Sequence, residues 1–296
     1  MKRTFVVSVV SSLFLCSCVM RTADVSAEQT SDIHTIYASL ESSPAVKNII
    51  DDATRKTSWL SGDAINVFFG ASESSRFVTS ESGEVAQFKG SIDVVTGGGE
   101  GLSDDTSLWG IYPYDSRNVC DGSHVTLSLP ADQQAAENTF ANGLFPQIAR
   151  SWNFYMTFYN LCGCIKFTVS ASDIRKVTLS GNADEPIAGK VKVSMEGVPE
   201  VVEVLSPLTE LTMCAPDVGC FKPGVSYYFV LLPTTFSKGL TMTYYKESTR
   251  ASYVVTKSTT LSRNKVSSLS GRDAGLTYEN IPLHDWEEGG HVGGEI

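Results

Sequence analysis

The feature that most constrains the fold is a succession of short segments in which apolar and polar residues alternate. The segment 124–129 shows the pattern, since Val125, Leu127 and Leu129 alternate with polar residues and a proline follows. Such segments recur at intervals of roughly ten residues, with Gly, Pro, Asn and Asp between them, as is typical of antiparallel β-sandwiches. Almost no segment has the 3.6-residue period of a helix. The alternation therefore predicts an all-β protein.

The predicted strands extend over most of the chain. They lie at 33–40, 64–70, 76–79, 85–89, 124–129, 161–169, 174–179, 187–195, 201–205, 210–214, 225–232, 240–246 and 252–256. The best helical candidate is the short, weakly amphipathic segment Ala131–Asn142. So many short strands would overfill one pair of sheets. We therefore expect two sandwich domains in tandem, at 59–158 and 159–280, with the boundary near Tyr159.

The N-terminus has the features of an export signal. Lys2 and Arg3 precede an uncharged apolar run that ends in Leu15-Cys16-Ser17-Cys18. The run is too short to span a bilayer, so it predicts a secretory signal. A leucine three places before a cysteine, with serine directly before it, is typical of bacterial lipoproteins. We expect a signal peptide at 1–17 and lipidation of Cys18; the alternative is an ordinary signal that is cut elsewhere.

The segment 18–58 reads as a leader that ends in a linker. Within it, 33–40 alternates with one nearly apolar face, made of His34, Ile36, Ala38 and Leu40, as in a strand with one buried side. The following residues, 41–58, lose this pattern and include the basic pair Arg55-Lys56. Their composition predicts an exposed, protease-accessible linker.

Charge and motifs argue against several functions. The formal net charge of −10 gives the chain no electrostatic reason to bind nucleic acid. The four histidines are dispersed, and neither a Gly-x-Ser-x-Gly elbow nor a His-Glu-x-x-His motif is present. We predict a protein that is not an enzyme and needs no cofactor; a β-sandwich hydrolase with scattered carboxylates is the catalytic alternative.

The cysteines after the lipoprotein motif suggest no metal site. They are five in number: Cys120, Cys162, Cys164, Cys214 and Cys220. The Cys-Gly-Cys spacing departs from that of zinc knuckles, and no histidine lies close by. A four-thiolate site is the alternative, but free or partly paired structural cysteines are expected.

Aromatic residues gather in the latter part of the first half. Trp109 and Trp152 are the residues that we predict as glycan contacts, because aromatic faces on a β-sandwich stack on sugar rings; packing in the core is the competing explanation. The tail 281–296 is acidic and rich in glycine around Trp286. It reads as a segment that docks elsewhere, or as a frayed end.

Four motifs together resemble the fimbrillin-family lipoproteins, pilins or pilin-like proteins of Gram-negative anaerobes. They are Trp59 through Gly-Asp-Ala-Ile-Asn-Val-Phe-Phe-Gly, Tyr112-Pro113-Tyr114 with Leu129-Pro130-Ala131-Asp132-Gln133, the stretch 158–167 around Cys162-Gly163-Cys164, and the stretch 227–233. The resemblance covers essentially the whole mature chain. It implies two tandem transthyretin-like β-sandwich domains, export to the outer membrane as a lipoprotein, and assembly by strand exchange after cleavage by an arginine-specific protease.

This resemblance assigns roles to particular segments. It makes 33–40 the strand that is removed, Arg55 the site of cleavage, and the tail around Trp286 the donor of a replacement strand. The resemblance also implies that the partners of the protein are other fimbrial subunits and a host or bacterial surface receptor. It places the protein at the cell surface, in a fimbrium. The glycine-rich tail favours an accessory or tip subunit. The alternative is a monomeric surface lipoprotein that binds glycans.

Overall fold

The computed structural model describes residues 33–41, 58–91, 107–216 and 219–282. They belong to one compact unit that begins at Ser31. Within these ranges the chain forms strands joined by turns and loops and contains no α-helix, which confirms the all-β prediction. No helix in the described part is long and apolar enough to cross a membrane.

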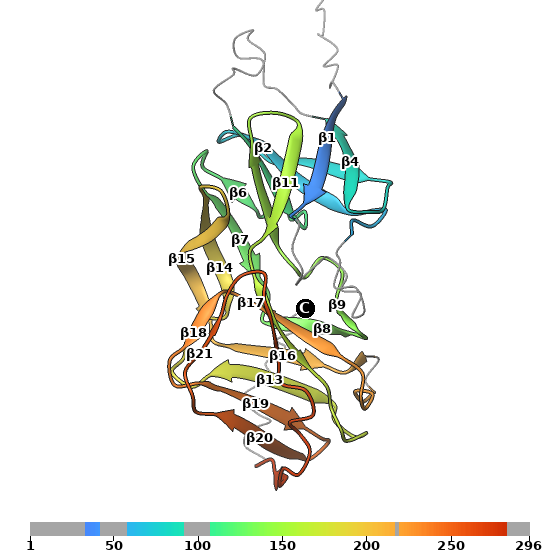
Figure 1. The fold of residues 1–296 in the computed structure, drawn as a ribbon, viewed down its shortest axis with the longest axis vertical. Helices are drawn as coiled ribbons and strands as arrows, with labels where there is room; N and C mark the ends of the chain where they lie inside the picture. Colours follow the sequence, from blue (N-terminus) through green and yellow to red (C-terminus); the bar gives the residue numbers. More distant parts are fainter. Residues whose placement is uncertain (1–32, 42–57, 92–106, 217–218, 283–296) are drawn as a thin grey trace, which may run out of the picture. The chain divides into compact units, whose positions relative to one another are not determined.

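Seven strands close into a barrel in the first half of the chain (Figure 1). In order around the barrel they are β1 (Ile33–Leu40), β11 (Tyr155–Asn160), β10 (Gln147–Ser151), β5 (Leu108–Tyr112), β2 (Ala64–Phe69), β3 (Ser75–Thr79) and β4 (Val85–Ser91). The predicted strand 33–40 is therefore present with the expected bounds. Its expected buried face is present too, with Ile36 and Ala38 fully buried.

The remaining strands form four further sheets. One has the order β15-β14-β7-β6, with β15 (Pro199–Leu208), β14 (Ala188–Met195), β7 (Val125–Leu129) and β6 (Val119–Cys120). A seven-stranded sheet contains β23 (Glu279–Asn280), β20 (Thr249–Val255), β19 (Leu240–Tyr245), β13 (Lys176–Gly181), β16 (Glu210–Cys214), β8 (Asp132–Ala136) and β9 (Thr139–Phe140). Smaller sheets join β17 (Tyr227–Leu231), β12 (Gly163–Phe167) and β22 (Val266–Ser268), and join β18 (Thr234–Phe236) to β21 (Thr259–Leu261).

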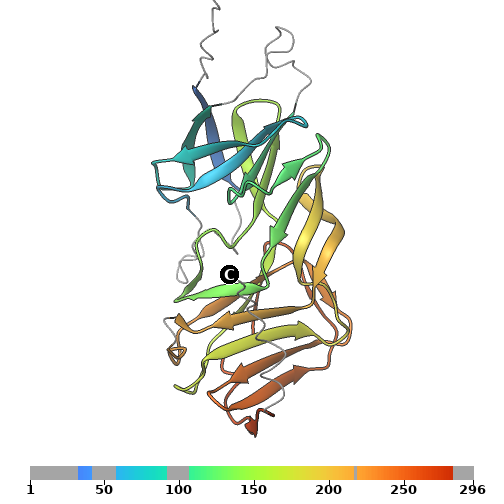
Figure 2. The ribbon, with the colours of Figure 1, turned by 180° about the vertical axis from the view of Figure 1, so that it is seen from behind.

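The sheets do not divide at the predicted boundary near Tyr159. Strands β7 and β8, from the first half of the sequence, pair with β14 and β16 of the second half, and β6 and β9 extend these sheets by pairing with β7 and β8. β7 pairs with β14 from Val125↔Val193 to Leu129↔Gly189, and Figure 2 shows the green strand beside the yellow hairpin. The reason is the alternation of β7 itself, because its buried face packs into the hydrophobic cluster that contains most of the core residues of the second half. The division into two tandem domains near Tyr159 therefore remains a prediction from the sequence.

The helical prediction for Ala131–Asn142 is wrong. The segment forms β8 and β9, joined by a turn at Asn138, whose φ is 59°. Gln133 explains the difference: its side-chain amide donates to the Val230 carbonyl at 2.6 Å, and its side-chain oxygen accepts from the Val230 N–H at 2.9 Å. A side chain that bonds a distant backbone holds the segment extended, which no local period reveals.

Trp59 anchors the interior of the barrel. It is fully buried and makes edge-on contacts with Phe88, Tyr112 and Phe158, at ring-centroid distances of 4.9, 5.4 and 5.3 Å. Its indole N–H donates to the carbonyl of Ala38 on β1, at 3.3 Å. The first motif of the family resemblance therefore begins with a core residue that also contacts the first strand.

We predict that Trp59→Ala lowers the free energy of unfolding by about 3–5 kcal/mol, because it empties the centre of the barrel. Trp152→Ala is the matched control, since Trp152 is 60% exposed and its removal should cost less than about 1 kcal/mol. Urea unfolding followed by circular dichroism measures both. Equal losses would show that Trp59 does not hold the barrel together.

Candidate functional site

The candidate site is the slot that β1 fills between β4 and β11 (Figure 1). On one side β1 pairs with β4 in the antiparallel sense, from Ile33↔Ser91 to Ser39↔Val85. On the other side it pairs with β11 in the parallel sense, from Tyr37↔Tyr155 to Leu40↔Phe158. The barrel is closed only because this one strand bonds both neighbours.

The inner face of β1 completes the core of the barrel. Ile36 and Ala38 have no exposed surface and belong to the same hydrophobic cluster as Trp59, Phe88 and Phe158. Burying a side chain such as Ile36 stabilises a fold by roughly 1.5–3 kcal/mol. Loss of β1 would therefore leave an apolar slot as well as unpaired backbone groups.

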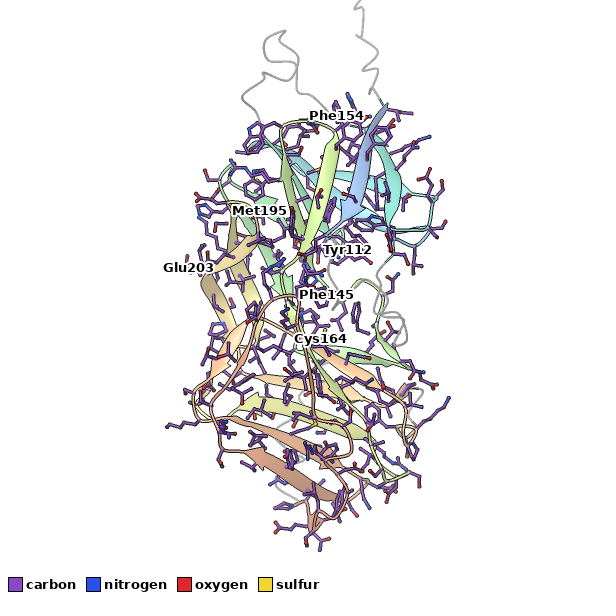
Figure 3. The ribbon with its side chains drawn as sticks, viewed as in Figure 1. Tyr112, Phe145, Phe154, Cys164, Met195 and Glu203 are labelled. Carbon is purple, nitrogen blue, oxygen red and sulfur yellow. The ribbon has the colours of Figure 1, made fainter. Side chains whose placement is uncertain are left out.

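Two side chains of β1 stack on rings in and just before β11, Tyr37 from its outer face and His34 from the end of its inner face. The rings of Tyr37 and Tyr155 stack at 4.8 Å with an interplanar angle of 16°, and those of His34 and Phe154 stack at 5.7 Å. Figure 3 shows Phe154 at the turn that precedes β11, at the end of the barrel away from Tyr112. Cross-strand aromatic pairs of this kind contribute roughly 0.2–1 kcal/mol each. These contacts help to stabilise β1 in the slot without shielding the strand from solvent.

The last described residue of this segment, Glu41, ties β1 to a distant part of the chain. Its carboxylate lies 2.6 Å from Nη2 and 3.3 Å from Nη1 of Arg263, which is 222 residues further along. The other carboxylate oxygen accepts a hydrogen bond from the backbone N–H of Asn160 at 2.7 Å. The two side chains are 10% and 22% exposed, so this ion pair is largely shielded from water.

Arg263 is itself held in place by the polar groups around it. Its Nε donates to the carbonyl of Asn160 at 3.0 Å. The side-chain amide of Asn160 donates to the Asn264 side chain at 3.0 Å and accepts from Gln147 at 2.7 Å. The guanidinium is therefore oriented by residues other than Glu41.

Burial raises the pKa of the Glu41 carboxyl, while the Asn160 amide and the Arg263 guanidinium lower it. The pKa of Glu41 stays raised on balance, so its two partners offset only part of the cost of burying the carboxylate. No local pattern in the sequence indicates this contact, because Glu41 lies in what reads as a polar linker and Arg263 lies in a loop. Only the fold brings them together.

Three of the predicted site residues, Cys18, Arg55 and Trp286, lie outside the described residues. The two tryptophans predicted as glycan contacts differ from each other. Trp152 is 60% exposed, whereas Trp109 is fully buried and its indole N–H donates to the Gly122 carbonyl at 3.3 Å. The prediction for Trp109 is wrong, because a sugar ring cannot reach a side chain in the core.

The five described cysteines are free. Free cysteines are one of the two outcomes expected from the sequence, the other being partial pairing. Cys162 and Cys164 are fully buried, and burial raises the pKa of both thiols. Burial also raises the pKa of Cys120 to about 11. In the described part of the chain, no three His, Cys, Asp or Glu side chains gather as metal ligands would. Cys120, Cys162 and Cys164 act as small core residues, whereas Cys214 is exposed and Cys220 is partly buried.

A cavity of about 540 Å³ lies apart from β1, at one end of the seven-stranded sheet. Several of its cations already have partners. Arg175 lies 3.5 Å from Glu247, Lys246 lies 3.0 Å from Asp173, and the Lys176 ammonium stands 4.0 Å from the centre of the Tyr245 ring. Its described lining residues also include the free, exposed Cys214 but no histidine.

Comparison with known proteins identifies the fold. No family profile and no curated sequence match the chain. A structure from Bacteroides ovatus, described as a "putative cell adhesion protein", aligns at a TM-score of 0.52 with 14% identity, over 85% of this chain and 96% of that one. One of the same description from Bacteroides uniformis gives 0.48 with 13% identity, over 83% and 96%. The tip fimbrial protein Mfa3 of Porphyromonas gingivalis gives 0.38 with 10% identity, over 83% and 99%.

The first of these likenesses shows a shared fold, and the two below 0.5 add nothing to that conclusion. The structure that shares the fold is described as a "putative cell adhesion protein". The all-β sandwich class predicted from the alternation is confirmed. The resemblance to the fimbrillin family is confirmed at the level of the fold.

We predict that Arg263→Gln lowers the free energy of unfolding by about 1–3 kcal/mol, because it leaves a largely buried carboxylate without its cation. Arg117→Gln is the control, since Arg117 pairs with Asp115 on the surface and its side chain is 84% exposed. A double-mutant cycle with Glu41→Gln, measured by urea unfolding, isolates the pair. A coupling energy near zero would contradict the prediction.

Proposed function

We propose that this chain is a fimbrial subunit or an accessory or tip adhesin of the bacterial surface, assembled by exchange of β1 for a strand of another subunit. The position of β1 carries the proposal. It is the first strand of the described chain, it closes the barrel, and sequence that reads as a cleavable linker follows it. The likeness to a protein described as a cell adhesion protein supports this role.

The proposed cleavage at Arg55 would leave the rest of the barrel with its core. Arg55 falls between β1 and Trp59, whose backbone N–H donates to the Gly83 carbonyl at 2.7 Å. A cut there separates β1 from the residues that follow, so that only pairing and packing still hold it. Trp59, in contrast, stays with the body of the protein. Departure of β1 would then open the slot.

The open slot would capture an extended segment by β-augmentation. Exposed N–H and C=O groups on β4 and β11 would pair with an incoming strand, and the positions of Ile36 and Ala38 would accept its apolar side chains. The tail 281–296 with Trp286 is the proposed donor towards the next subunit. Because that tail is glycine-rich and makes a weak strand, an accessory or tip position is favoured.

Export to the cell surface would precede this assembly. The segment 1–17 would act as the signal peptide, and lipidated Cys18 would anchor the chain in the outer membrane until cleavage releases it. The partners are then other fimbrial subunits and a surface receptor. The mechanism is assembly and adhesion, not catalysis.

Mass spectrometry of the protein extracted from the cell surface tests processing directly. We expect a mature N-terminus at Lys56 and recovery in detergent-resistant multimers. Arg55→Ala should abolish both, whereas Arg117→Ala, at an exposed position, should change neither. A wild-type chain that still begins at lipidated Cys18 and remains monomeric would overturn the exchange mechanism.

A monomeric glycan-binding lipoprotein is the second candidate, supported by the exposed rings of Trp152 and Tyr155. They are 60% and 68% exposed, and the Arg150 guanidinium stands 5.3 Å from the centre of the Trp152 ring. In that case Trp152→Ala should weaken binding on a glycan array by roughly tenfold or more, since stacking on an aromatic face is lost. Arg55→Ala should leave that binding unchanged.

A further inference from the structure

We propose that Arg263 selects the strand that occupies the β1 slot, by requiring a carboxylate at the position of Glu41. The inference rests on the proposed strand exchange and adds to it the chemistry of the partner. The partner is an extended segment of another subunit that carries an acidic residue just after the residues that replace β1.

The end of the slot has the geometry of a carboxylate site. Three donors converge on Glu41: Nη1 and Nη2 of Arg263 and the backbone N–H of Asn160, at 3.3, 2.6 and 2.7 Å. The backbone N–H of Glu41 donates to the Phe158 carbonyl at 2.9 Å, which continues the pairing of β1 with β11 by one residue. The acid is thus held by the same register that seats Ile36 and Ala38.

These donors stay behind when β1 leaves. Asn160 ends β11, and Arg263 lies in the loop between β21 and β22, so both belong to the body of the protein. The guanidinium keeps its hydrogen bond from Nε to the Asn160 carbonyl and remains oriented. In an emptied slot Nη1 and Nη2 of this preorganised cation would have lost the Glu41 carboxylate, which favours an incoming carboxylate and disfavours a neutral residue at the same place.

The register defines the expected pattern of the incoming strand. Relative to the acid, an apolar residue belongs five places earlier, at the position of Ile36, and a small one three places earlier, at that of Ala38. In this chain's own tail no glutamate meets both requirements: Glu295 has Gly290 where Ile36 should be, and Glu288 has Leu283 there but the charged Asp285 at the position of Ala38, where Glu287 has His284. The pattern therefore points to a donor from a different subunit and not to a second copy of this chain.

A peptide-exchange experiment tests the selection. A specific protease site is inserted into the linker 42–57, the folded chain is cut, and a fluorescent, C-terminally amidated peptide with the sequence of residues 33–43 competes for the slot. A second peptide differs only by Glu41→Gln. We expect the acidic peptide to bind roughly ten- to a hundredfold more tightly, because the neutral one leaves the guanidinium without its charged partner.

Variants of the body of the protein separate selection from general packing. In Arg263→Gln the two peptides should bind equally, whereas in the control Arg117→Gln the preference should persist. Equal binding of both peptides to the unchanged chain overturns the selection while leaving strand exchange intact. Binding of neither peptide overturns strand exchange, and the selection with it.

Discussion

The structure depends on one constraint, which is that the barrel closes only through β1. A curled sheet that ends in two free edges exposes two rows of unpaired N–H and C=O groups, and full closure removes them. Here β4 and β11 are those edges, and β1 bonds both. Its parallel pairing with β11 cannot come from a hairpin, so the strand must arrive from a distant part of the chain. It comes from the N-terminal end of the described residues.

That constraint connects stability with the proposed role. The interactions that hold β1 are of ordinary kinds: a backbone ladder on each side, two fully buried side chains, and stacked aromatics at its outer face. None of them needs a covalent link to the rest of the chain once the fold has formed. Any extended segment with a matching pattern offers the same backbone ladder. The barrel is thus suited to the proposed exchange, in which its own strand is cut away and another takes its place.

Sequence alternation revealed the strands but not their partners. It located β1 with its bounds and buried face, because a strand with one solvent-exposed side shows apolar and polar residues in alternation. It failed at Ala131–Asn142, where Gln133 bonds the backbone of Val230 across 97 residues. It could not separate the buried Trp109 from the exposed Trp152, since both lie in aromatic-rich sequence. The Glu41–Arg263 pair was equally hidden, as neither residue has a distinctive neighbourhood in the chain.

The Glu41–Arg263 pair is better understood as a device for register than as a source of stability. A partly buried ion pair gains little net free energy over apolar packing, because removing two charges from water costs nearly what their attraction returns. A strand, however, that slips by one residue turns its whole buried face outward. With Arg263 at the end of the slot, a slipped strand would place Leu40 or Ser42 against the guanidinium and would move Ile36 and Ala38 out of the core. The two penalties act together, so the charge at one end and the apolar residues in the middle specify a single alignment.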